Sequence, residues 1–306
     1  MNFLIIMPDY QSECFSKSEN PLNILISFFY KFYSFLTVSS LFIAMTGFSL
    51  PLVSFLLYGM SVEFDLVLAS FFITFSVYSI NKLTDIKEDS VNLLNRVEFT
   101  TKNWYYIILM VIISSFAALY ISLLHSLFAF FIIFFPFCVG FVYSIKIANF
   151  RLKDIFCIKS ISVALAWAVV GTFIPVIVHS SDFITISAIF YFIFIKFFIY
   201  TVLFDIRDIE ADSQNNVITL PVFLGINKIK DLLLFLNSTF IIWLIFSHTF
   251  FYRYLFILIF SILYGYWQIL YFTREGKKIG KSLDLLVEGE FIMIAIVASL
   301  FSYVIV

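Results

Sequence analysis

The sequence predicts an all-α integral membrane protein that crosses the bilayer about nine times. The first observation is composition: 62% of the 306 residues are hydrophobic and only 13% are charged, whereas soluble domains carry about a quarter charged residues. The mean hydropathy of +1.03 agrees with this. The second observation is a series of apolar runs of membrane-spanning length. The third is that Lys and Arg gather at alternate ends of these runs.

The spans follow from the thickness of the bilayer, because a core of about 30 Å needs roughly 20 apolar residues in a helix. Nine stretches meet this requirement, at 30–58, 63–86, 103–123, 126–146, 156–178, 182–207, 228–249, 251–273 and 285–306. Pro51 lies inside the first stretch and predicts a kink or a break there. No polar connection is long enough for a soluble domain, so 23–306 is expected to form a single membrane domain.

Basic residues orient the predicted bundle, because cytoplasmic connections are enriched in Lys and Arg. Of 19 such residues, 17 lie before or at the start of the first span or in the connections after the second, fourth, sixth and eighth spans. Arg253 lies in a connection on the other side, and Lys196 lies inside the sixth span. The N-terminus is therefore expected to be cytoplasmic, with 1–22 as a short cytoplasmic or interfacial segment, and the C-terminus is expected across the membrane.

Two acidic clusters end apolar runs on the predicted cytoplasmic side. The stretch NKLTDIKED covers 81–89 after the second span, and DIRDIEAD covers 205–212 after the sixth. If each helix continues through its cluster, its main carboxylates share one face. A carboxylate at membrane depth is costly unless it is paired or bound to a ligand.

Two such faces turned toward each other would concentrate negative charge. Mg²⁺ relieves this repulsion by bridging a few carboxylates to substrate phosphates. The expected ligand is therefore a diphosphate. Basic residues near the same faces can take up the remaining phosphate charge; they are Lys82, Lys87, Arg96, Arg151, Lys153, Lys159 and Arg207. Ordinary solvated helix ends and an ion or proton pathway are the alternatives, although a pathway would place its charges in mid-span.

The two clusters resemble the paired motifs of the UbiA superfamily of intramembrane prenyltransferases. The matching residues are Asn81, Asp85 and Asp89 for N-x-x-x-D-x-x-x-D, and Asp205, Asp208 and Asp212 for D-x-x-D-x-x-x-D. The family's later T-L-P and Gly stand at 219–221 and Gly225, and 143–171 is similar to its YS…RLK…K stretch. The resemblance covers nearly the whole chain.

Some positions depart from the family pattern. Asn92 and Arg96 stand where N-x-P-x-R-P is common, but the prolines are missing. Lys82 replaces an acidic residue, and Asn216 replaces a glycine. The predicted metal ligands are intact, so the resemblance still implies an active enzyme.

The resemblance implies a central cavity, closed by helices, in which an isoprenoid tail lies along apolar walls. It implies Mg²⁺ as the cofactor, and it implies a prenyl diphosphate, an aromatic or hydrophobic acceptor and the lipid bilayer as partners, with no nucleic acid. The implied metal ligands are Asn81, Asp85, Asp89, Asp205, Asp208 and Asp212, of which Asp85, Asp89, Asp205 and Asp208 are also the implied catalytic residues. The implied diphosphate-binding residues are Asn81, Asn92, Arg96, Arg151, Lys153 and Lys159.

The expected function is therefore Mg²⁺-dependent transfer of a prenyl group to a small acceptor within the membrane, with release of diphosphate. A membrane terpene cyclase of the same superfamily and a non-catalytic transporter or lipid-binding protein are the alternatives. Tyr143 and Tyr200 are candidates for contact with the allylic end of the substrate. Lys196 can snorkel, pair or contact another wall of the cavity, and the sequence does not choose between these.

Overall fold

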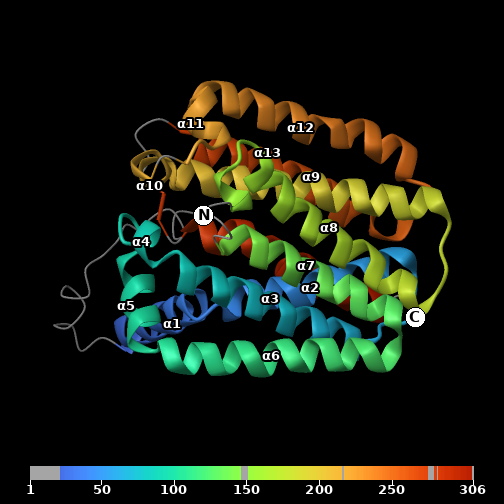
Figure 1. The fold of residues 1–306 in the computed structure, drawn as a ribbon. Helices are drawn as coiled ribbons and strands as arrows, with labels where there is room; N and C mark the ends of the chain where they lie inside the picture. The colour runs from blue at the N-terminus through green and yellow to red at the C-terminus, as the bar shows by residue number, and fades with distance from the viewer. Residues whose placement is uncertain (1–20, 146–150, 216, 275–278, 281, 305–306) are drawn as a thin grey trace.

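The computed structural model describes residues 21–145, 151–215, 217–274, 279–280 and 282–304, and Figure 1 shows a bundle of long helices. These residues form helices, turns and loops, with no strand among them. Within the same residues, nine helices are long and apolar enough to cross a membrane. The predicted fold class is confirmed. The predicted segment 1–22 lies almost entirely outside the described residues.

The membrane-spanning helices keep the predicted order. They are α2 (Leu41–Tyr58), α3 (Phe64–Thr84), α6 (Trp104–His125), α7 (Leu127–Ser144), α8 (Ile158–Val178), α9 (Phe183–Arg207), α12 (Ile226–Ser247), α13 (Leu255–Phe272) and α14 (Gly289–Val304). Five further helices are α1 (Pro21–Val38), α4 (Ile86–Asp89), α5 (Leu94–Lys102), α10 (Ile209–Gln214) and α11 (Leu220–Leu224). A 3₁₀ turn, η2 (Leu152–Asp154), precedes α8, and a π-helical turn, η4 (Asp284–Glu288), leads into α14.

The first predicted span differs from the structure, which divides it into α1 and α2. The break lies at Ser40, whose φ of 68° is left-handed, and not at Pro51, which lies inside α2. Pro51 has no N–H for the carbonyl of Gly47 one turn earlier. The Ser70 hydroxyl donates to that carbonyl at 2.7 Å instead, so the helix continues through the proline.

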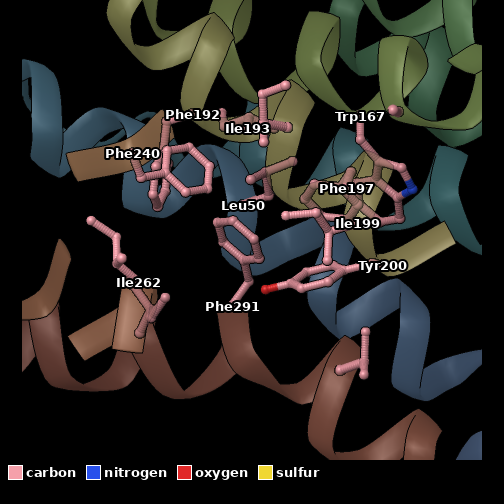
Figure 2. Close-up of a cluster of buried hydrophobic side chains, with 14 of the residues drawn as sticks. Leu50, Trp167, Phe192, Ile193, Phe197, Ile199, Tyr200, Phe240, Ile262 and Phe291 are labelled. Atoms are coloured by element: carbon pink, nitrogen blue, oxygen red, sulfur yellow. The ribbon is translucent and has the colours of Figure 1, made fainter. Parts of the chain in front are cut away.

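The bundle has an aromatic core along α9. Trp167 stacks on Phe197 with ring centroids 4.5 Å apart, and Phe197 stacks on Phe291 at 5.2 Å. Figure 2 shows Tyr200 beside these rings, which come from α8, α9 and α14. Large apolar side chains also cover the outside of the bundle, where Phe183 is 82% exposed, as a helix facing lipid tails allows.

The short helices α4 and α10 contact each other. They lie at the same end of the bundle, on the left in Figure 1, and α14 ends at the opposite end. The two acidic clusters, which are about 120 residues apart in sequence, thus meet at one end of the helices.

Candidate active site

A cavity of about 1170 Å³ opens between the helix ends that carry the acidic clusters. Its polar wall comes from the ends of α3, α8 and α9 and from α4, α10 and η4, while its apolar wall lies deeper on α3, α7, α8 and α9. Ligand pockets usually have volumes of about 300–1,000 Å³. This cavity therefore has room for a long apolar ligand together with a second molecule.

Both acidic clusters interrupt their helices at an aspartate. Helix α3 ends and α4 begins at Asp85, with φ −98° and ψ 12°. Helix α9 ends and α10 begins at Asp208, with φ −96° and ψ 7°. The continuous helices expected from the sequence are therefore interrupted at the central residue of each motif, and the last aspartate lies on the short helix that follows.

The first cluster is paired with cations from two other segments. Lys153 Nζ lies 2.5 Å from Asp85 Oδ1 and also pairs with Glu88, and Arg151 Nη1 lies 3.0 Å from Glu88. Arg96 Nε, from α5, lies 2.9 Å from Asp89 Oδ2.

Asn81 also belongs to this cluster, and its side-chain oxygen accepts a hydrogen bond from Ser144 at 3.1 Å. Asp85 is only 7% exposed. A carboxylate with so little access to water needs the charge of Lys153.

The second cluster is paired with the first turn of α8. Lys159 Nζ lies 2.9 Å from Asp205 and 3.0 Å from Asp212, so one ammonium group joins two carboxylates. The Ser160 hydroxyl donates to Asp205 at 2.9 Å. Asp205 is thereby held by two adjacent residues of one helix.

Two contacts join the clusters to each other and to η4. The Asn92 amide donates to Asp208 at 2.7 Å, which links the segment after α4 to the end of α9. Arg207 lies 2.9 Å from its neighbour Asp208 and 2.9 Å from Asp284 on η4. Each of the five motif aspartates at the mouth of the cavity therefore has a cation as its partner.

The carboxyl groups outside the spans differ in their pKa values. Burial raises the pKa of Asp89 to about 6 although Arg96 opposes this, and burial raises the pKa of Asp212 to about 6 against the effect of Lys159. Burial also acts upward on Glu88 and Asp208, but their cations outweigh it, so both pKa values lie below the ordinary range. Each motif thus carries one carboxyl that takes up a proton readily.

The donor set fits a magnesium ion shared with a phosphate ligand. Among the described residues, no three His, Cys, Asp or Glu side chains converge as a ready metal cage. Mg²⁺ usually binds through one or two carboxylates together with substrate phosphates and waters, and it does not need such a cage. The aspartates at this cavity mouth supply hard oxygen donors in pairs, as that coordination requires.

Most of the predicted site residues meet at this cavity. The predicted residues that line it are Asn81, Asp85, Asp89, Asn92, Arg96, Lys153, Lys159, Asp205, Asp208 and Asp212. Arg151 is the exception, because it is not among the residues that line this cavity. It is buried and pairs with Glu88 instead.

Two further residues of the cavity wall were not assigned from the sequence. Asp284 and Glu288 line the cavity from η4. Their position at the start of a span on the predicted cytoplasmic side, four residues apart, resembles the two recognised clusters and was a usable signal. Lys82 also lines the cavity and was expected to take up phosphate charge, but its Nζ donates to the carbonyls of Thr37 and Val38 at 2.7 and 2.9 Å, which caps the end of α1.

Below the charged mouth, the cavity wall is aromatic. Its rings come from α3, α7, α8 and α9 and belong to Tyr78, Tyr143, Trp167, Phe197 and Tyr200. The Trp167 indole donates to the Tyr78 hydroxyl at 3.1 Å, so its polar atom is satisfied. A ligand that enters this cavity meets charge first and aromatic faces next.

The arrangement agrees with a family model. Residues 35–287 match the model of the UbiA prenyltransferase family. The chain belongs to the UbiA prenyltransferase family. The matched region contains both acidic motifs and eight complete spans, whereas most of α1 precedes it. A search of curated proteins found no match.

Solved UbiA structures share the fold at low sequence identity. A UbiA homolog from Archaeoglobus fulgidus bound to GPP and Mg²⁺ is 18% identical, with a TM-score of 0.69 over 89% of this chain and 98% of that chain. The same homolog bound to DMAPP and Mg²⁺ gives a TM-score of 0.58 over 86% and 95%. A digeranylgeranylglyceryl phosphate synthase is 16% identical, with a TM-score of 0.57 over 88% and 96%.

Proposed function

We propose that this UbiA-family protein transfers a prenyl group from a prenyl diphosphate to a small aromatic acceptor within the membrane. The observation that carries the proposal is the meeting of two aspartate-bearing helix ends at the mouth of one cavity with aromatic walls. The ligands of the Archaeoglobus fulgidus homolog, GPP or DMAPP with Mg²⁺, support it.

The aspartates are the proposed ligands of Mg²⁺. The residues that would hold the metal are Asn81, Asp85, Asp89, Asp205, Asp208 and Asp212, and the carboxylates of Asp85, Asp89, Asp205 and Asp208 are proposed as the catalytic groups. When bound, the metal supplies positive charge that stabilises a departing diphosphate. Hard oxygen donors of this type suit Mg²⁺ better than a softer ion.

The cations at the mouth are the proposed diphosphate-binding groups. Lys153 and Lys159 each contact two carboxylates, so each ammonium group lies beside groups that are proposed to hold the metal and its phosphate ligand. Asn92 and Arg96 extend this binding surface on the side of α5. Arg151 contributes through Glu88, which it holds beside Lys153.

The proposed reaction needs no oxidant or reductant. The C1–O bond of the prenyl diphosphate breaks, and its electron pair leaves with the diphosphate. An electron-rich carbon of the acceptor then forms a bond to C1 and loses its proton to water or to the released diphosphate. The aromatic wall below the mouth would face the reacting carbons, because aromatic rings attract cations.

The proposed orientation follows from the basic connections. The cavity mouth lies at the end of the bundle where those connections gather, so we assign it to the cytoplasmic side. A water-soluble diphosphate product could then leave to the cytoplasm, while an apolar product stays in the bilayer.

Product analysis tests the proposal. Membranes that carry the protein are incubated with Mg²⁺ and with dimethylallyl, geranyl or longer prenyl diphosphates, with and without a panel of aromatic acceptors. We expect diphosphate release and a prenylated acceptor by mass spectrometry, both lost with EDTA. Hydrocarbon products without any acceptor would instead indicate a cyclase, and no diphosphate release with any donor would indicate a non-catalytic protein.

A further inference from the structure

The apolar part of the cavity ends partway along the helices that form it. The lining residues farthest from the mouth are Thr74 on α3, Pro136 on α7, Val170 on α8 and Phe197 on α9. Helix α8 continues beyond Val170 as far as Val178, but none of these later residues lines the cavity. The cavity therefore has a floor inside the bundle.

A second apolar core fills the space between the helices beyond this floor. Val170 is 4% exposed and belongs both to the cavity wall and to this core. Further members are Phe55 on α2, Ile133 on α7 and Ile174 on α8, which are fully buried and do not line the cavity. Protein cores are packed as densely as organic crystals. A ligand chain would have to displace these side chains to pass the floor.

Stacked rings form the wall of the cavity at the same depth. Trp167 stacks on Phe197 with centroids 4.5 Å apart, and Phe197 stacks on Phe291 at 5.2 Å (Figure 2). The Trp167 indole is also held by its hydrogen bond to Tyr78 on α3. Side chains from α3, α8, α9 and α14 thus fix this part of the wall.

Helix geometry gives the depth of the floor. Lys159, which pairs with Asp205 and Asp212 at the mouth, precedes Val170 by 11 residues, which is about 16 Å along the helix axis. Phe197 precedes Asp205 by eight residues, or about 12 Å. An extended isoprenyl unit adds four bonds of about 1.5 Å in a zigzag, hence roughly 5 Å. The floor therefore lies about two to three isoprenyl units below the carboxylates.

We propose that the prenyl donor carries two or three isoprenyl units, as in geranyl or farnesyl diphosphate, and that Val170 sets this limit. The inference rests on the proposed function, since that function places the diphosphate at the mouth and the chain below it. A fourth unit would reach the packed layer that contains Phe55, Ile133 and Ile174. Overfilling a well-packed core is destabilising, so a longer chain gains no affinity.

One face of α8 measures the chain. Val163, Ala166 and Val170 line the cavity and recur at spacings of three and four residues, which places them on one side of the helix. They lie about 6, 10 and 16 Å beyond Lys159 along the axis. A bulky side chain at Ala166 or at Val170 should therefore block the chain at different lengths.

Binding of donor analogues tests the length limit. Purified protein with Mg²⁺ is titrated by calorimetry with thiolodiphosphates, which resist ionisation, bearing dimethylallyl, geranyl, farnesyl or geranylgeranyl chains. Affinity should rise at least about tenfold with each unit up to farnesyl, because each unit buries apolar surface. From farnesyl to geranylgeranyl we expect no rise or a fall.

Substitutions on α8 test the role of the wall. Val170→Phe should weaken binding of the farnesyl analogue about tenfold or more and leave the geranyl analogue within about threefold. Ala166→Phe should also weaken the geranyl analogue, while the dimethylallyl analogue still binds and shows that the variant is folded. Ile161→Phe is the matched control, because Ile161 is 42% exposed on α8 and does not line the cavity.

The outcomes separate the length limit from the proposed function. If affinity rises from farnesyl to geranylgeranyl as steeply as before, the limit is overturned while prenyl transfer is untouched. If Val170→Phe keeps the wild-type length profile, the role of Val170 is overturned. If the analogues bind with the expected limit but no donor releases diphosphate with any acceptor, the proposed function falls and the limit stands. If no analogue binds, both fall.

Discussion

The two aspartate motifs share a backbone design but differ in what holds them. Both interrupt a membrane helix at an aspartate with nearly the same dihedral angles, at Asp85 and at Asp208. The first motif takes its cations from α5 and from the segment at 151–153. The second takes them from the first turn of α8 and from its own helix.

From this difference we expect the second motif to be the more rigid half of the site. Lys159 and Ser160 reach Asp205 from a membrane-spanning helix packed along α9, so the second motif is preorganised. Lys153 reaches Asp85 from the short turn η2, which must be held in place by its neighbours. Sites built on long helices are more accurately positioned than sites built on loops.

The largest expected effect is loss of turnover when either inner carboxylate is neutralised. Asp85→Asn and Asp205→Asn each remove a proposed metal ligand while keeping a similar shape. We expect at least about a 1,000-fold fall in Mg²⁺-dependent diphosphate release from geranyl diphosphate. Glu210→Gln is the matched control, because Glu210 is exposed on α10. Activity near the wild-type level with either variant would contradict the assignment.

A pH titration compares the two motifs directly, because each holds one carboxyl with a pKa of about 6, Asp89 and Asp212. Protonation removes a metal ligand, so we expect Mg²⁺ affinity to fall about 100-fold from pH 7 to pH 5, or roughly tenfold for each carboxyl. Calorimetric titration of the metal-free protein measures this, and Asp89→Asn should halve the slope. A constant Mg²⁺ affinity over this range would contradict the prediction that Asp89 and Asp212 both become protonated near pH 6.

Protonation of the same two carboxyls should weaken Mg²⁺ binding but stabilise the folded state. Their pKa values are higher in the folded state than in the unfolded state, so the folded state binds protons more tightly. Without metal, the free energy of unfolding should therefore rise as the pH falls from above 6 toward 4. Thermal unfolding of the metal-free protein across this range measures that change.

The basic residues within the motifs provide the next comparison, because Arg207 pairs with the carboxylates of Asp208 and Asp284, whereas Lys82 donates to backbone carbonyls of α1. Arg207→Met leaves Asp208 and Asp284 without their cation, and loss of such an orienting partner should lower kcat/KM about 10- to 100-fold. Lys82→Met should lower stability by about 1–3 kcal/mol through the freed carbonyls of α1, with much smaller effects on kcat/KM. Equal effects on catalysis would contradict the distinction.

The sequence was sufficient for the features that depend on local length and spacing. Nine apolar runs predict nine spans because the bilayer sets the length of each, and the aspartate spacing identified both motifs. The interruptions at Asp85 and Asp208 were not predicted, because aspartates at this spacing are also compatible with a continuous helix. In both clusters the identities of the residues were a better guide than their expected helical geometry.

The remaining features depend on partners that are distant in sequence. The carbonyl that Pro51 leaves free is satisfied by Ser70 on the next spanning helix, so the proline did not reveal that α2 continues through it. Lys196 was visible as an intramembrane charge, but its partner Glu290 is on the last helix. The packing of all the helices determines which distant residues become partners, and a single sequence does not reveal that packing.

The smallest expected effect concerns the serine that donates a hydrogen bond to each motif. Ser160 donates to the Asp205 carboxylate at 2.9 Å, and Ser144 donates to the neutral Asn81 side chain at 3.1 Å. Hydrogen bonds to charged groups contribute more than neutral ones, so Ser160→Ala should lower Mg²⁺ affinity about tenfold and Ser144→Ala about threefold. Calorimetry on both variants measures the ratio. A larger loss with Ser144→Ala would mean that the first motif, and not the second, is the preorganised half of the site.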